Sequence, residues 1–150
     1  MKKAVRWLKI TGIVILCLPV ALAALLLLWE VFCAAVNNIS GFFHTQDVLN
    51  GYSNTRDVEV LGNVTFVGNT TGTGNHTEVR STVLVRAESP TAVEYWTNGD
   101  NYELYPLFQK VPEEKLKRWD RELELPYESD GCYVVEVYGD VPFPDSIAGH

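Results

Sequence analysis

The chain has 150 residues, of which 47% are apolar, and carries a formal net charge of −7. Its charge is unevenly distributed, because the only basic residues before Glu30 fall in the first nine positions and all 19 acidic residues fall at Glu30 or later. The acidic remainder has no basic stripe, which argues against a nucleic-acid partner. After the apolar N-terminal stretch, roughly 100 residues remain, enough for one modest core but not for two.

Residues 10–29 form the clearest segment, because they contain no charge. Twenty helical residues rise about 30 Å, the thickness of a bilayer's hydrocarbon core. Trp7 and Trp29 bracket the segment, as aromatic residues do at membrane interfaces. The positive-inside rule then predicts a cytoplasmic basic stub at 1–9 and a transmembrane signal-anchor helix at 10–36, with the acidic part translocated.

A cleaved signal peptide is the alternative for this segment. Signal peptides have an apolar region of only ~7–15 residues, which favours retention of the longer stretch found here. Cys33-Ala34-Ala35 nevertheless supplies small residues at the −3 and −1 positions of a cut after Ala35. Both outcomes stay open at this point.

The three cysteines are divided between the apolar segment and the outer part. Cys17 and Cys33 lie in or beside the apolar segment, which leaves Cys132 alone in the outer domain. We expect Cys132 to be a small buried hydrophobe in a strand. A Cys33–Cys132 bridge or a dimer through Cys33 is the alternative.

Residues 37–56 are mostly polar and predict a juxtamembrane linker. Phe42-Phe43 is an apolar island in it, resting either on the lipid interface or on the domain. Residues 48–52 are expected to extend this island as a short helix, with Asn50-Gly51 near its end. Residues 57–150 then form an extracytoplasmic α+β domain.

Two strands are expected next, over 57–67 and 77–87, because apolar residues alternate in both. Val58, Val60, Gly62, Val64 and Phe66 should share one face of the first strand, with Leu61 and Val67 as exceptions. Val79, Ser81, Val83, Val85 and Ala87 should share the inner face of the second strand, and its alternate residues, Glu78, Arg80, Thr82, Leu84 and Arg86, the outer face. An antiparallel hairpin with a long loop is the simplest connection.

The remaining elements follow from capping and periodicity. Ser89-Pro90 predicts a helix start, although the next residues also alternate like a strand. Residues 102–108 look extended, and Pro106 restricts them to an edge strand or loop. Pro112 opens a helix whose apolar stripe is Leu116, Trp119 and Leu123. A final strand is expected over 131–139, so the fold class is α+β: a small antiparallel sheet with one or two helices.

The loop between the first two strands is the first candidate site. It lacks the lysine of a phosphate-binding loop and the third glycine of a dinucleotide fingerprint. We therefore expect a flexible hairpin loop or a recognition loop, whose contact residues would be Asn69, Thr70, Thr71, Thr73, Asn75 and His76. Asn38, Asn63, Asn69 and Asn75 also begin glycosylation sequons, which matter only in a eukaryotic secretory pathway.

Other candidates are weaker. Tyr102 and Tyr105 could line a groove for a sugar or a peptide, or fill the core. Carboxylates available for acid/base chemistry include Glu88, Glu94 and Glu136, each of which is more simply explained as a solvated side chain. The widely spaced histidines do not have metal-ligand spacing, and the common nucleophile motifs are absent. We therefore expect no catalytic residues, no metal and no cofactor.

The sequence predicts a non-catalytic, membrane-anchored binding or accessory module of the cell envelope. Its expected partners are the lipid bilayer and another envelope protein or a wall polymer. An assembly subunit acting through its membrane helix is the alternative, supported weakly by Gly12, Ala21 and Ala24. A small carboxylate-dependent hydrolase is a further alternative. The sequence does not indicate the oligomeric state.

Overall fold

The computed structural model describes residues 2–53, 55, 57–69, 76–94, 101–107, 109, 111–126 and 130–144, with side chains from residue 11 onward. The elements in chain order are α1 Lys2–Ser53, β1 Val58–Gly68, β2 Glu78–Ala87, α2 Pro90–Glu94, β3 Asn101–Pro106, α3 Glu113–Leu123 and β4 Cys132–Asp140. The fold is α+β, with one long helix and a four-stranded antiparallel sheet in the order β1-β2-β4-β3. This confirms the predicted fold class, the β1–β2 hairpin and the edge position of β3.

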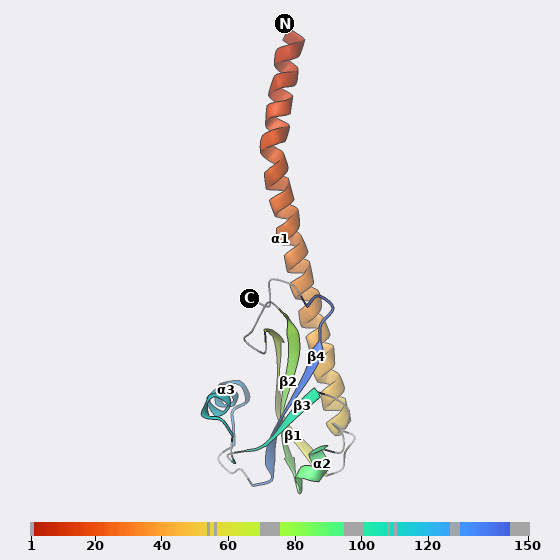
Figure 1. The fold of residues 1–150 in the computed structure, drawn as a ribbon. Coiled ribbons are helices and arrows are strands. Elements are labelled where there is room, and N and C mark those ends of the chain that lie inside the picture. Colours follow the sequence, from red (N-terminus) through yellow and green to blue (C-terminus); the bar gives the residue numbers. More distant parts are fainter. Residues whose placement is uncertain are drawn as a thin grey trace.

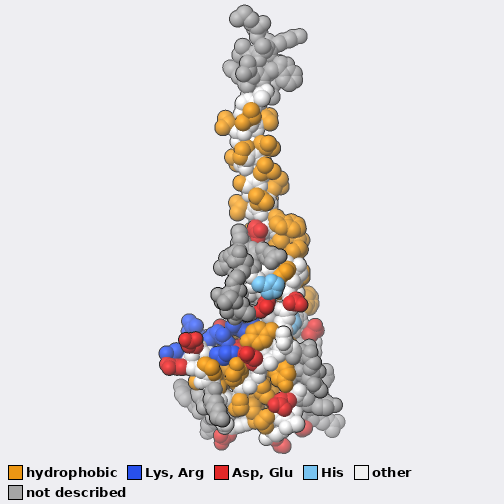
Figure 2. All heavy atoms as spheres, viewed as in Figure 1, with side chains coloured by type: hydrophobic (Ala, Val, Ile, Leu, Met, Phe, Trp, Pro, Cys, Tyr) orange, Lys and Arg blue, Asp and Glu red, His pale blue; other side chains and the backbone are white. Residues whose placement is uncertain are grey.

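α1 is a single helix of 52 residues, and only its C-terminal half packs on the sheet (Figure 1). Its N-terminal half stands free of the domain, and its apolar side chains from Ile13 to Trp29 are exposed (Figure 2). Among the described residues, α1 is the only helix long and apolar enough to cross a membrane. Length and composition alone would also fit a signal sequence.

The C-terminal half of α1 corrects the conformation expected for residues 37–56. These residues were expected to form a linker with a short helix, but α1 runs without a break to Ser53. Its contact face is buried, and Val48 and Tyr52 belong to the main hydrophobic core. This face includes Asn37, Gly41 and Thr45, small or polar residues that pack closely on the strands but have the composition of a linker.

The sheet has a helix on each face (Figure 1). α1 and the short α2 cover one face, where Val83, Val85 and Val135 form the centre of the main core. α3 covers the other face, where Trp119 and Leu123 pack against Leu84, Val134 and Cys132. Cys132 is buried in β4, as predicted, and all three cysteines are free thiols.

Because α3 covers the second face, the outer face expected for β2 is wrong over most of its length. Arg80, Thr82 and Leu84 are all buried, although the alternation predicted that they would face solvent. No pattern within β2 indicates that α3, which follows later in the chain, covers this face. A charge introduced at Thr82 would therefore be buried, as it would be at Val83.

β1 contains a β-bulge between Val60 and Gly62, which changes the face of every later residue. Val58 and Val60 pack against the main core, whereas Val64 packs against the α3 cluster. The prediction that these residues share one face is therefore wrong. Leu61, noted as an exception to the alternation, is the residue inserted at the bulge.

Candidate functional site

Glu136 on β4 is fully buried and lies at the centre of a charged cluster beneath α3. Lys115 Nζ lies 2.9 Å from Glu136 Oε2, and Trp119 Nε1 donates a hydrogen bond to Oε1 at 3.1 Å. Arg118 donates to the same Oε1, and Arg80 Nε lies 3.6 Å from it. Three cationic side chains therefore surround one buried carboxylate.

A second carboxylate joins the cluster from β3. Glu103 Oε2 accepts hydrogen bonds from Lys115 Nζ at 2.5 Å, Tyr105 OH at 2.9 Å and Tyr138 OH at 3.1 Å. Tyr138 OH also lies 3.2 Å from Glu136 Oε2, so it bridges the two carboxylates. Figure 2 shows acidic and basic side chains gathered on this side of the domain.

The cluster includes a third acidic side chain, Glu122, which lies 3.9 Å from Arg80 and 4.0 Å from Arg118. Three acidic and three basic side chains therefore meet here, and their formal charges cancel. Glu136 is the fully buried charge of this set, and it is tolerated because it is paired and hydrogen-bonded. Arg80 Nε, Arg118 Nε and Glu122 Oε2 are also buried, and they have no hydrogen-bond partner in the described part of the chain. We name this set the Glu136 cluster; its members are Arg80, Glu103, Lys115, Arg118, Glu122 and Glu136.

The electrostatics of the Glu136 cluster resemble those of a structural ion network. Burial by itself would raise the pKa of Glu136, but hydrogen bonds from Lys115 and Trp119 and the charge of Arg118 lower it below its ordinary value. The pKa of Glu103 is also lowered, because its hydrogen bonds, led by that from Lys115, outweigh its burial. Burial by itself would lower the pKa of Lys115, but its hydrogen bonds with Glu103, Tyr105 and Glu136 raise it.

A carboxylate pair that performs acid/base catalysis has one member with a raised pKa, so that it can donate a proton near neutral pH. Glu103 and Glu136 both have lowered pKa values and are therefore both ionised. Lys115, with a raised pKa, stays protonated and cannot act as a base. The arrangement fixes α3 to the sheet.

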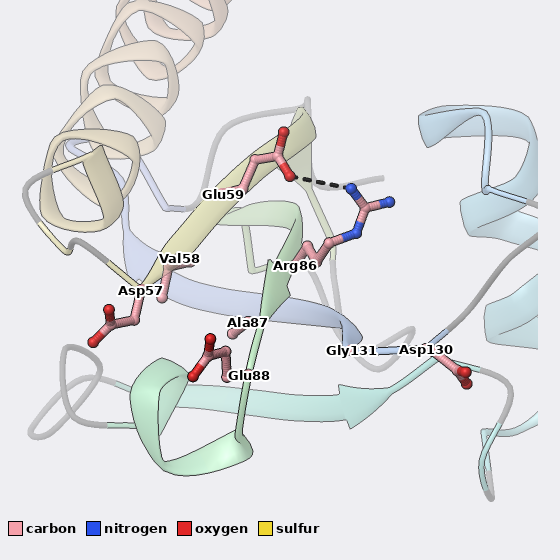
Figure 3. Close-up of a pocket in the computed structure, with 8 residues that line it drawn as sticks. All are labelled: Asp57, Val58, Glu59, Arg86, Ala87, Glu88, Asp130 and Gly131. Atoms are coloured by element: carbon pink, nitrogen blue, oxygen red, sulfur yellow. Dashed lines mark hydrogen bonds and ion pairs between the residues drawn. The ribbon is translucent and has the colours of Figure 1, made fainter.

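The second candidate is an open hollow of about 450 Å³ at the end of the sheet where β1 begins and β2 ends (Figure 3). Four carboxylates line it, from Asp57, Glu59, Glu88 and Asp130, together with Arg86. Arg86 Nη1 pairs with Glu59 Oε2 at 3.1 Å, and both side chains are exposed. Among the described residues, no group of three His, Cys, Asp or Glu side chains is arranged to hold a metal ion.

The two tyrosines predicted to line a groove lie on opposite faces of β3. Tyr102 packs against the main core on the α1 side. Tyr105 belongs to the α3 side, where its ring is tilted against that of Trp119 with centroids 5.3 Å apart. The three carboxylates singled out from the sequence are also separated. Glu88 lines the hollow, Glu94 ends α2 and Glu136 lies beneath α3.

The predicted recognition loop lies mostly outside the described residues, which include only Asn69 and His76 of its six members. His76 Nε2 lies 3.9 Å from Glu78 Oε1. The strand ends flanking the loop, at Gly68 and Glu78, pair near Asp140, at the end of the sheet nearest the apolar half of α1. The loop and the acidic hollow are therefore attached to opposite ends of the sheet.

Contacts between α1 and the chain after β4 were not anticipated from the sequence. The buried Asn37 side chain forms two hydrogen bonds with the Phe143 backbone: Nδ2 donates to the carbonyl oxygen at 2.8 Å, and Oδ1 accepts from the amide at 3.0 Å. The Phe143 ring packs on Trp29 and Phe32, with centroids 5.7 and 6.0 Å away. The segment after β4 is thereby fixed to α1 next to its free apolar half.

Comparison with known proteins finds no matching family model, no matching curated protein and no matching solved structure.

Proposed function

We propose that this protein is a single-pass membrane protein in which α1 anchors a non-catalytic accessory domain on the outer side of the membrane. One observation carries the proposal: the same helix that presents exposed apolar side chains in its N-terminal half forms part of the domain's core in its C-terminal half. A free apolar helix of this length is stable in lipid and costly in water.

The orientation follows from the distribution of charge. Lys2, Lys3, Arg6 and Lys9 precede the apolar segment, and such residues are retained in the cytoplasm. Trp29 lies at the other end, beside Phe32 and Phe143, and this aromatic group is suited to the membrane–water boundary. The domain then begins directly above the bilayer surface, without an intervening linker.

The charged side chains also support an accessory rather than a catalytic role. The Glu136 cluster is internally neutralised, and the acidic hollow is open and lined by exposed side chains. A rigidly anchored domain of this kind is suited to presenting a surface to another envelope protein or to a wall polymer. The partner would meet the domain at a fixed height and orientation above the membrane.

Labelling of introduced cysteines in intact cells tests the proposal. Lys117→Cys, on the exposed surface of α3, should react with a membrane-impermeant maleimide, whereas Lys3→Cys should react only after the membrane is opened. The native Cys17 is replaced by serine, and Cys33 and Cys132 are buried. The chain should also resist carbonate extraction and keep its N-terminal residues by mass. A chain cut after Ala35, or labelling with the opposite pattern, would overturn the anchor.

A further inference from the structure

The face of α1 that points away from the sheet is apolar well beyond the expected membrane segment. Ile39, Phe42 and Phe43 are 56%, 55% and 60% exposed, although they lie beside the folded domain. The two phenylalanine rings contact each other, with centroids 5.8 Å apart, and do not cover the domain core. The structure thus answers one question left by the sequence: this aromatic island does not rest on its own domain.

Nine of the exposed apolar residues of α1 fall on a seven-residue repeat. They alternate at spacings of four and three along α1, which is the pattern of a helix that packs along a second helix. We name this set the outer seam; its members are Val14, Leu18, Ala21, Leu25, Leu28, Phe32, Ala35, Ile39 and Phe42. Within a uniformly apolar membrane segment the repeat would mean little. It continues, however, through Ile39 and Phe42, where Asn37, Asn38 and Ser40 occupy other positions of the helix.

The two sides of α1 are distinct in this region. Asn37, Gly41 and Thr45 contact the chain's own domain, and they occupy repeat positions off the outer seam. Figure 1 shows α1 at one side of the molecule, with the sheet and α3 on its other side. Phe32 also contacts the Phe143 ring of the chain's own segment after β4. Above Phe32, where Ala35, Ile39 and Phe42 are exposed, a helix can approach the outer seam without meeting the domain.

The hydrocarbon core of the bilayer alone does not cover the outer seam, which rises about 42 Å from Val14 to Phe42. The uncharged outer face extends from Thr11 to Phe43, or about 50 Å of helix, against about 30 Å of hydrocarbon. Burying the whole face by tilting α1 would require a tilt of more than about 50°, beyond the 0–40° range found for membrane helices. About 18 Å of this face, from Val31 to Phe43, therefore remains above the hydrocarbon of an upright helix.

The charge distribution allows a second copy to occupy the outer seam. Between Lys9 and Asp47 the only charged residue is Glu30, which lies on the face that carries Asn37 and Gly41. Two parallel copies would place identical positions opposite each other, and no like charges would meet along the seam. The apolar seam ends at Gln46, whose amide can form a hydrogen bond with its counterpart.

We propose that α1 of a second copy packs parallel along the outer seam, both within the membrane and for about three turns above it. The proposal rests on membrane anchoring as proposed above, because anchoring gives both copies the same orientation. Closed two-fold pairing is the commonest arrangement of identical chains. The two domains would then face outward from a central helix pair, leaving both acidic hollows accessible.

Cysteine cross-linking of the full chain in membranes tests the pairing, in a Cys17→Ser background. Ala35→Cys lies on the outer seam and should form a disulfide-linked dimer on mild oxidation, because disulfides require Cβ atoms within about 4.5 Å. Asp47→Cys is exposed on the same helix but off the seam, and it should remain monomeric. Adding Ile39→Asp to Ala35→Cys should reduce the dimer at least tenfold, whereas Ile39→Leu should preserve it.

Three results separate this inference from its premise. Release of the chain by carbonate would overturn the anchor itself. An Ala35→Cys chain that stays in the membrane but remains monomeric would overturn only the self-association, and a lipid-like emission from a fluorophore attached to the introduced thiol would then identify lipid as the cover. Cross-linking that is unaffected by Ile39→Asp would also overturn the proposed packing of a second α1 along the outer seam. Tryptophan fluorescence provides a control for folding, because Trp119 is buried in the domain and Ile39 lies outside the core.

Discussion

Trp119 on α3 donates its indole N–H to Glu136 on β4 at 3.1 Å, and both side chains are fully buried. This bond joins the apolar and the charged parts of the α3 interface. The same indole ring packs in the cluster with Leu84, Leu123 and Val134. α3 is therefore held to the sheet both by apolar packing, through Trp119 and Leu123, and by the Glu136 cluster, through Lys115 and Arg118.

Glu136→Gln should destabilise the domain strongly. The amide keeps the shape of the side chain but removes the charge that pairs with Lys115, Arg118 and Arg80. Breaking a buried ion pair by removing one partner costs about 3–5 kcal/mol. Urea unfolding followed by tryptophan fluorescence measures the loss. Glu113→Gln is the matched control, because its pair with Lys117 is exposed, and an equal loss in both variants would contradict the prediction.

Stability should fall at both extremes of pH. Glu136 and Glu103 have folded-state pKa values below the ordinary 4.5, so the unfolded state binds protons first and stability is lost as pH falls below about 4.5. Tyr52 and Tyr138 have pKa values raised above 10.0, and Lys115 above 10.5. The unfolded state then loses protons first, so stability is lost as pH rises past about 10.

The free energy of unfolding measured in urea between about pH 2 and pH 11 checks this dependence. In the Glu136→Gln variant, the free energy of unfolding should fall less steeply below about pH 4.5, because one carboxyl with a lowered pKa is gone. The loss of stability above about pH 10 that Tyr52 causes should be unchanged. An acid limb as steep as that of the wild type would show that Glu136 is not the group responsible.

Gly41→Ala should loosen α1 from the sheet. A Cβ at Gly41 would lie 2.5 Å from Val67 Cγ2 and 3.2 Å from Thr65 Cγ2. The gain in helix propensity, about 1 kcal/mol, is outweighed by overpacking, which costs about 1–3 kcal/mol. Thermal unfolding should show a lower midpoint. Gly62→Ala is the comparison, because its nearest neighbour would be 3.7 Å away, and a larger loss there would refute the assignment.

Asn37→Ala should release the segment after β4. It removes both hydrogen bonds to the Phe143 backbone and leaves that peptide group without its side-chain partner. Leaving such buried groups unsatisfied costs about 1–3 kcal/mol. Faster hydrogen exchange at the Phe143 amide reports the release. Asn38→Ala should have little effect, because Asn38 is exposed and donates only to Ala34 of its own helix. Similar exchange in both variants would exclude this role of Asn37.

A truncated chain beginning near residue 32 should fold in solution, whereas one beginning near residue 54 should not. The shorter chain lacks Val48 and Tyr52, which lie in the main core, and exposes the α1 face of the sheet. Cooperative thermal unfolding distinguishes the two chains, and the longer one should keep Cys132 protected from thiol reagents. A cooperative transition in the shorter chain would show that α1 is only a tether.

The elements with one dominant period could be predicted from the sequence. β2, β4 and α3 were found because their apolar residues repeat every two residues or every three to four. The failures concern residues whose role depends on a distant partner. Asn37, Gly41 and Thr45 have the composition of a linker, and only the strands against which they pack make them part of a helix–sheet interface.

The candidate site was less predictable for the same reason. Glu136 could be noted as a carboxylate in a strand, but its partners lie 17 to 21 positions away on α3 and elsewhere on the sheet. The bulge at Leu61 reverses the faces of β1, and no local signal other than a break in the alternation marks it. Tyr102 and Tyr105, three residues apart on one strand, point to opposite faces as the pleat requires.

Because α1 runs into the domain without a break, the number of residues in its apolar half sets the direction in which the domain faces. A flexible linker would let the domain swivel; a continuous helix transmits every rotation of its membrane portion to the sheet. One residue inserted between Thr11 and Leu28 would turn the whole domain by about 100° and raise it by about 1.5 Å relative to the N-terminal stub. With α1 anchored as proposed, a change of about 10° in its tilt would sweep the acidic hollow sideways by about 6 Å, since the helix rises about 33 Å from Val31 to Ser53.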